Sequence, residues 1–159
     1  MPTVKNKQIG FLVNDTSSSQ MSFCLIKNIN EYLDDTNDDF VLFFEDSSAS
    51  ILNPNFATMS FNEIWSFDGV LISTSISTTL SLIKSFSPVK KFFYVWDLEW
   101  MRREHKDFEQ SVQAFINPSV ELIARSKDHA KAIENYCNRK VNHIVNDFNI
   151  EKIVRITNE

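Results

Sequence analysis

The sequence predicts an α/β fold, a Rossmann-like three-layer sandwich with a mostly parallel sheet of about six strands. Three observations lead to this fold class. Apolar runs of roughly four to six residues, the length of strands buried on both faces, recur along the chain. Amphipathic segments of about ten residues separate these runs, and parallel neighbours need crossover connections of that size. The chain has 159 residues, of which 43% are hydrophobic and 23% charged, which fits a single domain over residues 1–159.

In the first half of the chain, predicted strands alternate with two amphipathic helices. The first helix follows small polar residues that can cap it, and it places Met21, Leu25 and Ile29 on one face. The second helix covers residues 75–85 and ends before Pro88. Residues 45–62 are rich in Ser, Asn and Pro, so we expect a long loop there with at most a short helix. Strands are predicted at residues 8–13, 40–44 and 69–73.

The second half continues this alternation. One helix is predicted over residues 106–115. Another begins after the N-cap Ser126 and runs through Tyr136, with Asp128 in its first turn, where a negative charge stabilises the helix dipole. Strands are predicted at residues 92–95, 121–124 and 141–145.

The chain holds only two glycines, Gly10 and Gly69, and this count excludes two nucleotide-binding motifs. The dinucleotide fingerprint needs three closely spaced glycines, and the P-loop needs two. The three histidines lie far apart without metal-ligand spacing, and no Gly-x-Ser-x-Gly elbow occurs. We therefore expect no metal site and no cofactor, and nucleophilic hydrolysis has no support in the sequence.

The net charge of −5 argues against a nucleic-acid partner, because Lys and Arg supply most of the affinity for phosphates. Residues 1–80 hold 3 Lys and Arg against 10 Asp and Glu, but residues 81–159 hold 13 against 11, which leaves room for a local anion site. No apolar run reaches the roughly 18 residues of a membrane span. Isolated Cys24 and Cys137, without a signal peptide, predict reduced thiols in a cytoplasmic protein. High Asn, Lys, Ile and Phe with little Gly is typical of an AT-rich genome, such as a viral one.

In an open parallel sheet, ligands bind beyond the carboxyl ends of the strands. The loop after the first predicted strand precedes a helix, whose free N–H groups attract phosphate or carboxylate, although helix capping is the more frequent role of such loops. The candidate ligand-binding residues in this loop are Asp15, Thr16, Ser17 and Ser18. The other polar segments expected at the same edge are residues 73–78, 96–103, 125–128 and 146–147.

Residues 96–100 have the most unusual composition in the chain, with two tryptophans and two carboxylates after a strand. Such indoles could stack on a sugar ring while the carboxylates accept hydrogen bonds from its hydroxyls. The arginines that follow could meet a diphosphate or another acidic group. The alternative is that one tryptophan belongs to the core and the charges form a solvated helix start. The candidate ligand-binding side chains are Trp96, Trp100, Arg102 and Arg103, and the candidate catalytic side chains are Asp97 and Glu99.

Three motifs follow one another in the second half of the chain. They are the strand and acidic stretch of residues 92–100, the strand that leads into Ala124-Arg125-Ser126, and the last strand with its turn at residues 146–147. As an ordered set, spread over residues 90–149, they resemble the amino-terminal domain of GT-B glycosyltransferases of the family 4 kind. The resemblance implies that this domain holds the acceptor of a sugar transfer.

The resemblance also assigns positions. Asp97 and Glu99 would match the acidic positions after the fourth strand, and Ser126 the serine after the fifth. Residues 15–18 would match the loop after the first strand, which is glycine-rich in relatives. Trp96 stands where relatives often carry His or Gln, a departure that bears on contact with the transferred sugar.

The family's second domain, which binds the sugar nucleotide, would begin near Glu159. We therefore expect a partner chain or a second copy to supply the donor side. In the resulting hypothesis, Asp97 or Glu99 orients an acceptor hydroxyl as general base, while Arg102 or Arg103 faces a phosphate.

Two other hypotheses stay open. The chain could be a non-catalytic interaction module or homodimer that keeps this fold. With 14 Phe, 3 Tyr and 3 Trp, some aromatic side chains are expected at the surface, where they favour association. It could also be a nucleotide-binding regulator of flavodoxin-like shape. In that case the hydroxyl-rich loops, including Ser73 and Thr74, would meet the phosphate.

Overall fold

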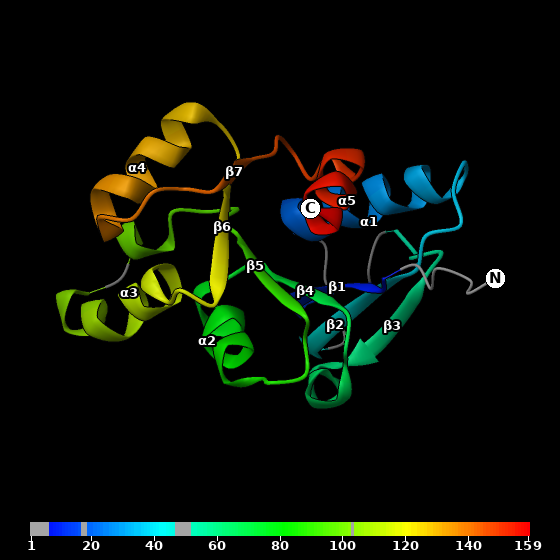
Figure 1. The fold of residues 1–159 in the computed structure, drawn as a ribbon, viewed down its shortest axis with the longest axis horizontal. Coiled ribbons are helices and arrows are strands. Elements are labelled where there is room, and N and C mark those ends of the chain that lie inside the picture. Colours follow the sequence, from blue (N-terminus) through cyan, green and yellow to red (C-terminus); the bar gives the residue numbers. More distant parts are fainter. Residues whose placement is uncertain (1–6, 17–18, 47–51, 103) are drawn as a thin grey trace.

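The computed structural model describes residues 7–16, 19–46, 52–102 and 104–159 (Figure 1). These residues form a sheet of seven strands in the order β3-β2-β1-β4-β5-β6-β7, and every neighbouring pair is parallel. The predicted parallel α/β fold is therefore confirmed. The strands are β1 (Ile9–Asp15), β2 (Phe40–Asp46), β3 (Ala57–Ser60), β4 (Val70–Ser73), β5 (Lys90–Tyr94), β6 (Val120–Ala124) and β7 (His143–Ile144).

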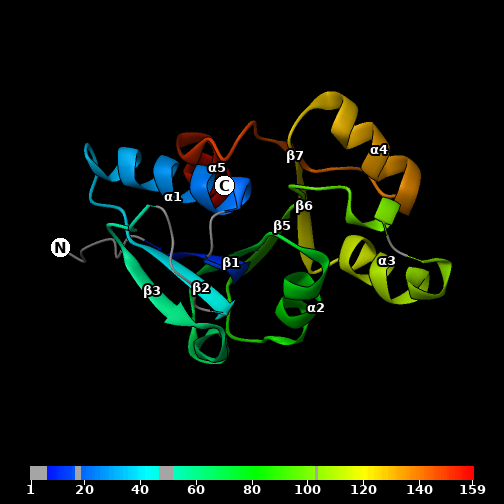
Figure 2. The ribbon, with the colours of Figure 1, turned by 180° about the vertical axis from the view of Figure 1, so that it is seen from behind.

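Helices cover both faces of the sheet, which makes the structure a three-layer sandwich (Figures 1 and 2). On one face α1 and α5 pack together over the centre of the sheet, and on the other face α2, α3 and α4 follow one another. The helices are α1 (Gln20–Leu33), α2 (Ile76–Lys84), α3 (Phe108–Ile116), α4 (Lys127–Cys137) and α5 (Ile150–Asn158). Short 3-10 helices cover Phe61–Ser66, Glu99–Arg102 and His105–Asp107.

Three elements differ from the sequence predictions. β3 lies inside the segment predicted as a long loop; its four side chains are all exposed, so the strand has no alternation of apolar and polar residues to reveal it. Residues 47–51 of that segment lie outside the described residues. β7 has two residues where five were predicted at 141–145. α5 was not predicted, although Ile150, Ile153 and Thr157 recur at helical spacing on its buried side.

The core is built from strands that are buried on both faces. In β1, Phe11 and Val13 point toward α1 and α5, whereas Leu12 points toward the opposite layer, and all three are fully buried. A strand with helices on both sides has no polar face, which explains the uninterrupted apolar runs in the sequence.

The two glycines serve close packing at the sheet. A Cβ atom on Gly10 would lie 2.6 Å from Leu71 Cδ2 and 2.8 Å from a ring carbon of Phe43. On Gly69 it would lie 2.3 Å from the carbonyl oxygen of Gln8. Neither glycine has a positive φ, so both positions require glycine for space rather than for backbone conformation.

Candidate functional site

The order of the strands reverses between β1 and β4, a point at which ligands bind in open parallel sheets. The chain leaves β1 for α1 on one face and leaves β4 for α2 on the other. Asn14 spans this point, because its Nδ2 donates to Glu45 Oε2 (3.1 Å) and to Ser77 Oγ (2.9 Å). The crevice is thus bridged by hydrogen bonds within the protein.

The loop after β1 caps α1. The side chain of Ser19 accepts a hydrogen bond from the N–H of Ser22 (3.1 Å), and Ser22 Oγ donates to the carbonyl oxygen of Asp15 (3.1 Å). This is the capping role that the sequence left open beside anion binding. Of the other predicted loop residues, Thr16 directly follows β1, while Ser17 and Ser18 lie outside the described residues.

The hydroxyls of Ser73 and Thr74 are buried and bonded within the protein. Ser73 Oγ lies 2.6 Å from Thr79 Oγ1 and donates to the carbonyl oxygen of Phe92 (3.2 Å). Thr74 Oγ1 donates to the carbonyl oxygen of Leu12 (2.6 Å). Both side chains therefore fix the end of β4 to its neighbours.

Glu99 and Asp97 face different neighbours although they are two residues apart. Glu99 Oε1 accepts the N–H of Ile76 at 2.9 Å, so this carboxylate caps the amino end of α2. Asp97 forms an ion pair with Arg102, and the two side chains are 52% and 70% exposed. Arg103 lies outside the described residues.

Both tryptophans are held in aromatic stacks. One face of the Trp96 indole stacks on Phe148 (ring centroids 5.2 Å apart, 11° between planes), and the guanidinium of Arg125 lies over the ring at 3.8 Å. Trp100 stacks on Tyr136 (4.2 Å, 8°). Both indoles are therefore engaged in contacts within the protein, Trp96 with Phe148 and Arg125, and Trp100 with Tyr136.

The carboxyl ends of β6 and β7 enclose a hollow of about 290 Å³. Its lining combines a guanidinium, a hydroxyl, an imidazole, an amide and a carboxylate, from Arg125, Ser126, His129, Asn146 and Asp147. Three of the expected edge segments therefore meet here, because Trp96 at the end of β5 lies under Arg125. We name this cavity the β6–β7 hollow.

Three contacts fix the Arg125 guanidinium. Its Nη1 donates to the carbonyl oxygen of Trp96 (3.3 Å), its Nη2 donates to Asp147 Oδ1 (3.0 Å), and its plane lies over the indole. The Asp147 side chain is 71% exposed, whereas that of Arg125 is 33% exposed. The pair thus presents an oriented carboxylate beside an anchored cation.

His129 and Ser126 form the wall of the hollow at the amino end of α4. Ser126 Oγ accepts the N–H of His129 (3.1 Å), as the predicted N-cap should. Burial lowers the pKa of His129, and the nearby charge of Arg125 lowers it further, while Asp97 acts in the opposite direction.

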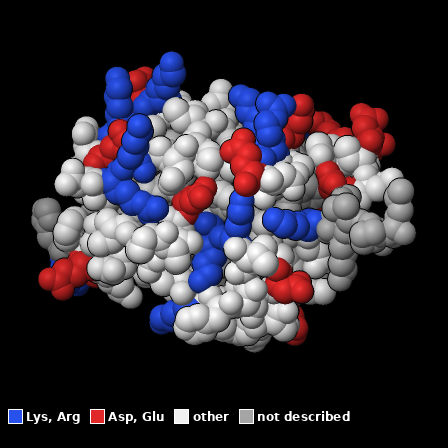
Figure 3. All heavy atoms as spheres, viewed as in Figure 1, with Lys and Arg blue, Asp and Glu red and all other residues white. Residues whose placement is uncertain are grey.

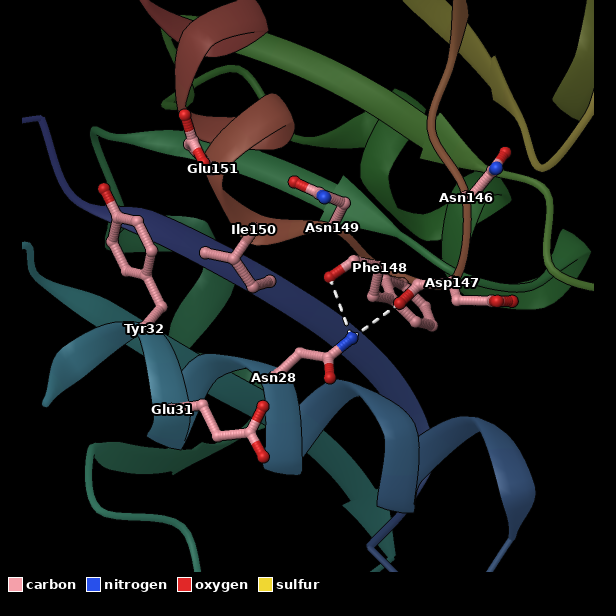
Figure 4. A pocket seen from close by; sticks show the side chains of 9 residues that line it. All are labelled: Asn28, Glu31, Tyr32, Asn146, Asp147, Phe148, Asn149, Ile150 and Glu151. Atoms are coloured by element: carbon pink, nitrogen blue, oxygen red, sulfur yellow. Dashed lines mark hydrogen bonds between the residues drawn. The ribbon is translucent and has the colours of Figure 1, made fainter.

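The turn that carries Asp147 has an unusual backbone. Asp147 (φ 43°) and Phe148 (φ 50°) are both left-handed, a conformation that side chains other than glycine adopt only where the surroundings enforce it. Asn28 on α1 donates from Nδ2 to the carbonyl oxygens of Asp147 (2.6 Å) and Phe148 (3.1 Å) (Figure 4). On the other side, the buried hydroxyl of Tyr94 accepts the N–H of Phe148 (3.1 Å) and donates to the carbonyl oxygen of Val145 (2.6 Å).

A second hollow of about 460 Å³ lies between α1 and α5 and shares this turn (Figure 4). Its carboxylates belong to Glu31, Asp147 and Glu151, and each of them pairs with a cation outside the lining. Tyr32, which also lines it, donates from its hydroxyl to Asp38 Oδ2 (2.6 Å). The polar groups of this hollow are thus largely engaged with the protein.

The fold and the polar edge place the chain in the class of Rossmann-like α/β proteins. Comparison with protein-family models, with curated proteins and with solved structures finds no match for this chain. In the described part of the chain, no group of three or more His, Cys, Asp or Glu side chains could hold a metal ion. None of the helices described has the length and apolar character that crossing a bilayer requires.

The sequence predicted most of the segments at this edge but gave no indication of two side chains that lie there. His129 was set aside because no second histidine stands at metal-ligand spacing, yet its position three residues after an N-cap places it on the hollow. Asn28 gave no signal in the sequence, since its partners Asp147 and Phe148 are more than a hundred residues away.

Proposed function

We propose that this protein is a glycosyltransferase-like domain that contributes the acceptor side of a sugar-transfer site. One observation carries the proposal. The three strand ends whose sequence resembles GT-B glycosyltransferases lie next to one another, and two of them line the β6–β7 hollow while the third lies beneath it. An acceptor bound there would meet donors and acceptors of hydrogen bonds from several strands, as ligands do at this edge of parallel sheets.

Within this proposal, the roles of the candidate residues differ. Asp97 orients the acceptor hydroxyl and accepts its proton as general base, because its exposed carboxylate follows β5, the strand next to β6, whose end lines the hollow. Glu99 acts as a positioning residue, because its carboxylate is engaged at the start of α2. Arg125, rather than Arg102, supplies the guanidinium in the hollow.

The donor side of the reaction comes from a partner chain or a second copy. The two glycines of this chain both occupy tightly packed positions, Gly10 in β1 and Gly69 directly before β4, so neither builds a loop around the phosphates of a sugar nucleotide.

Saturation-transfer NMR and calorimetry with a panel of sugars and sugar nucleotides test the proposal. We expect at least one sugar to bind and Asp97→Asn to weaken or reorient it, with Asp68→Asn as the control because this exposed carboxylate lies at the opposite edge of the sheet. If no member of the panel binds, alone or with a co-purified partner chain, the proposal is wrong.

A second candidate function is that of an interaction module or homodimer. The observation that favours it is a set of exposed apolar side chains near the amino edge of the sheet, Trp65 (51% exposed), Phe86 (97%) and Val89 (59%). Ser87 Oγ donates to the carbonyl oxygen of Trp65, which joins the 3-10 helix that carries Trp65 to the loop that carries Phe86 and Val89. Exposed apolar surface of this kind is often used for association.

Light scattering tests this candidate directly. A stable dimer or complex that dissociates on Phe86→Asp supports it, whereas a monomer at all concentrations contradicts homodimer formation. The double variant Asp97→Asn with Glu99→Gln separates the two functions, because an interaction module should keep its biological activity in that background.

A further inference from the structure

The β6–β7 hollow is nearly balanced in charge. Among the described residues that line it, the cation is Arg125, which is already paired with the carboxylate of Asp147 at 3.0 Å. The remaining lining groups are the hydroxyl of Ser126, the amide of Asn146 and the imidazole of His129. On the face shown in Figure 3, Lys and Arg side chains are interspersed with Asp and Glu.

This balance disfavours an anionic ligand. A phosphate or carboxylate in the hollow would have to compete with Asp147 for the guanidinium, and it would lie beside a like charge. An uncharged ligand does not have to displace Asp147 from the guanidinium, and the charge of Asp147 does not repel it. Hydroxyl groups can both donate and accept, whereas a carboxylate only accepts and a guanidinium only donates.

We propose that the Arg125–Asp147 pair recognises two neighbouring hydroxyl groups of an uncharged sugar, an inference that rests on the proposed function and names the class of its acceptor. Each hydroxyl donates a hydrogen bond to an oxygen of Asp147, and the guanidinium of Arg125 donates to one of the hydroxyl oxygens. The ligand therefore binds without breaking the ion pair.

The backbone supports a dedicated role for Asp147. Two successive left-handed residues other than glycine are costly, and here Asn28, Tyr94 and Arg125 together hold them in place. The result is a carboxylate that is anchored through one oxygen and exposed to the hollow. Prior orientation of this kind reduces the entropy that a ligand must overcome.

Amide NMR titrations of the full chain test the proposal. The neutral probes are the methyl glycosides of mannose, glucose and galactose, and the charged probes are glucose 1-phosphate and inorganic phosphate. We expect a neutral glycoside to shift the amide signals of Arg125, Ser126 and Asn146. Asp147→Asn should weaken this binding about tenfold or more, because each lost bond involves a charged group.

Two further variants complete the test, one at the ion pair and one as a control. Arg125→Lys retains the charge but not the planar fork, and it should also weaken the neutral glycoside. Asp68→Asn, at the opposite edge of the sheet, should bind as the parent does. The spectrum of each variant reports whether the fold is intact.

The possible failures are distinguishable. If the phosphate-bearing probes shift the same amides more strongly, or if Asp147→Asn leaves the glycoside affinity unchanged in a folded protein, the uncharged-diol inference is overturned while the sugar-transfer proposal stands. If no saccharide, sugar phosphate or sugar nucleotide perturbs the carboxyl edge, the proposed function fails together with the inference.

Discussion

The guanidinium of Arg125 lies over the indole of Trp96, 3.8 Å from the ring centroid. This contact joins the ends of β5 and β6, and the ion pair of Arg125 with Asp147 extends it to the turn after β7. Behind the indole, the ring of Phe148 stacks on Trp96 and on Tyr94. A continuous column of stacked groups thus lies beneath Arg125, which lines the hollow.

Arg125→Lys should lower the free energy of unfolding by about 1 to 2 kcal/mol, because an ammonium group cannot keep the stack, the carbonyl contact and the ion pair together. Chemical denaturation measures the loss. Arg155→Lys is the matched control, since Arg155 forms an exposed pair on α5 and should change stability by less than about 0.5 kcal/mol. Equal effects of the two changes would contradict the ordering role of Arg125.

Tyr94→Phe should destabilise the fold by about 1 to 3 kcal/mol, because it leaves the buried N–H of Phe148 and the carbonyl of Val145 without their shared partner. Urea titration of the variant and of the parent at pH 7 measures this change.

Tyr94 also predicts a dependence of stability on pH. Burial raises the pKa of Tyr94 to about 12, above the value near 10 of an unfolded tyrosine. Its contribution is therefore complete below pH 10 and is lost as pH rises toward 12, at roughly 1.4 kcal/mol per pH unit. Tyr94→Phe should show a flatter decline over this window. A parallel decline in both proteins would show that Tyr94 does not contribute.

Glycine-to-alanine changes should test the tight packing of the sheet. Gly69→Ala should cost more than Gly10→Ala, because its Cβ meets the backbone oxygen of Gln8, whereas Gly10 faces side chains that can shift. We expect about 1 to 3 kcal/mol for Gly10 and at least that for Gly69, measured by thermal unfolding. A neutral result at Gly69 would mean that the backbone relaxes freely there.

Arg139→Ala should destabilise the protein by about 2 to 3 kcal/mol. The guanidinium donates to the carbonyl oxygens of Phe115 (3.0 Å), Asn117 (3.0 Å) and Val120 (2.7 Å), and so ties the end of α4 to the connection between α3 and β6. Lys131→Ala, at an exposed position of α4, is the control and should change stability by less than about 0.5 kcal/mol.

Substitutions of Asp97 and of Glu99 should have different effects on the free energy of unfolding. Glu99→Ala removes the acceptor at the start of α2 and should cost about 1 kcal/mol, whereas Asp97→Ala removes only an exposed ion pair and should cost less than about 0.5 kcal/mol. In sugar binding we expect the opposite order. If both variants have the same stability and the same binding, the two carboxylates do not have the different roles proposed here.

The fold could be predicted from the sequence because strands buried on both faces leave long apolar runs, as in residues 9–13 and 40–44. β3 could not, since an exposed edge strand of four residues has no such pattern. The carboxyl edge followed from the parallel topology, which placed residues 125–128 and 146–147 among the segments to examine.

The roles of individual site residues were harder to predict. The sequence around Trp96 does not distinguish an indole that stacks on a ligand from one that stacks on Phe148. Only the structure places Phe148 against it. Glu99 likewise gave no sign of capping α2, because its partner Ile76 belongs to a distant helix. Contacts between distant segments depend on how the strands are ordered, which local spacing does not encode.

The contact between α1 and α5 has a consequence for synthesis on the ribosome. The face of the sheet that carries Phe11 is covered both by a helix made early and by residues 150–158, which are translated more than a hundred residues later. During translation that apolar face stays incompletely sealed, and the turn at Asp147 cannot meet Asn28 until it has left the exit tunnel. A nascent chain of this protein should therefore depend on holding chaperones for a longer time than a protein whose first helix packs only against segments close to it in the sequence.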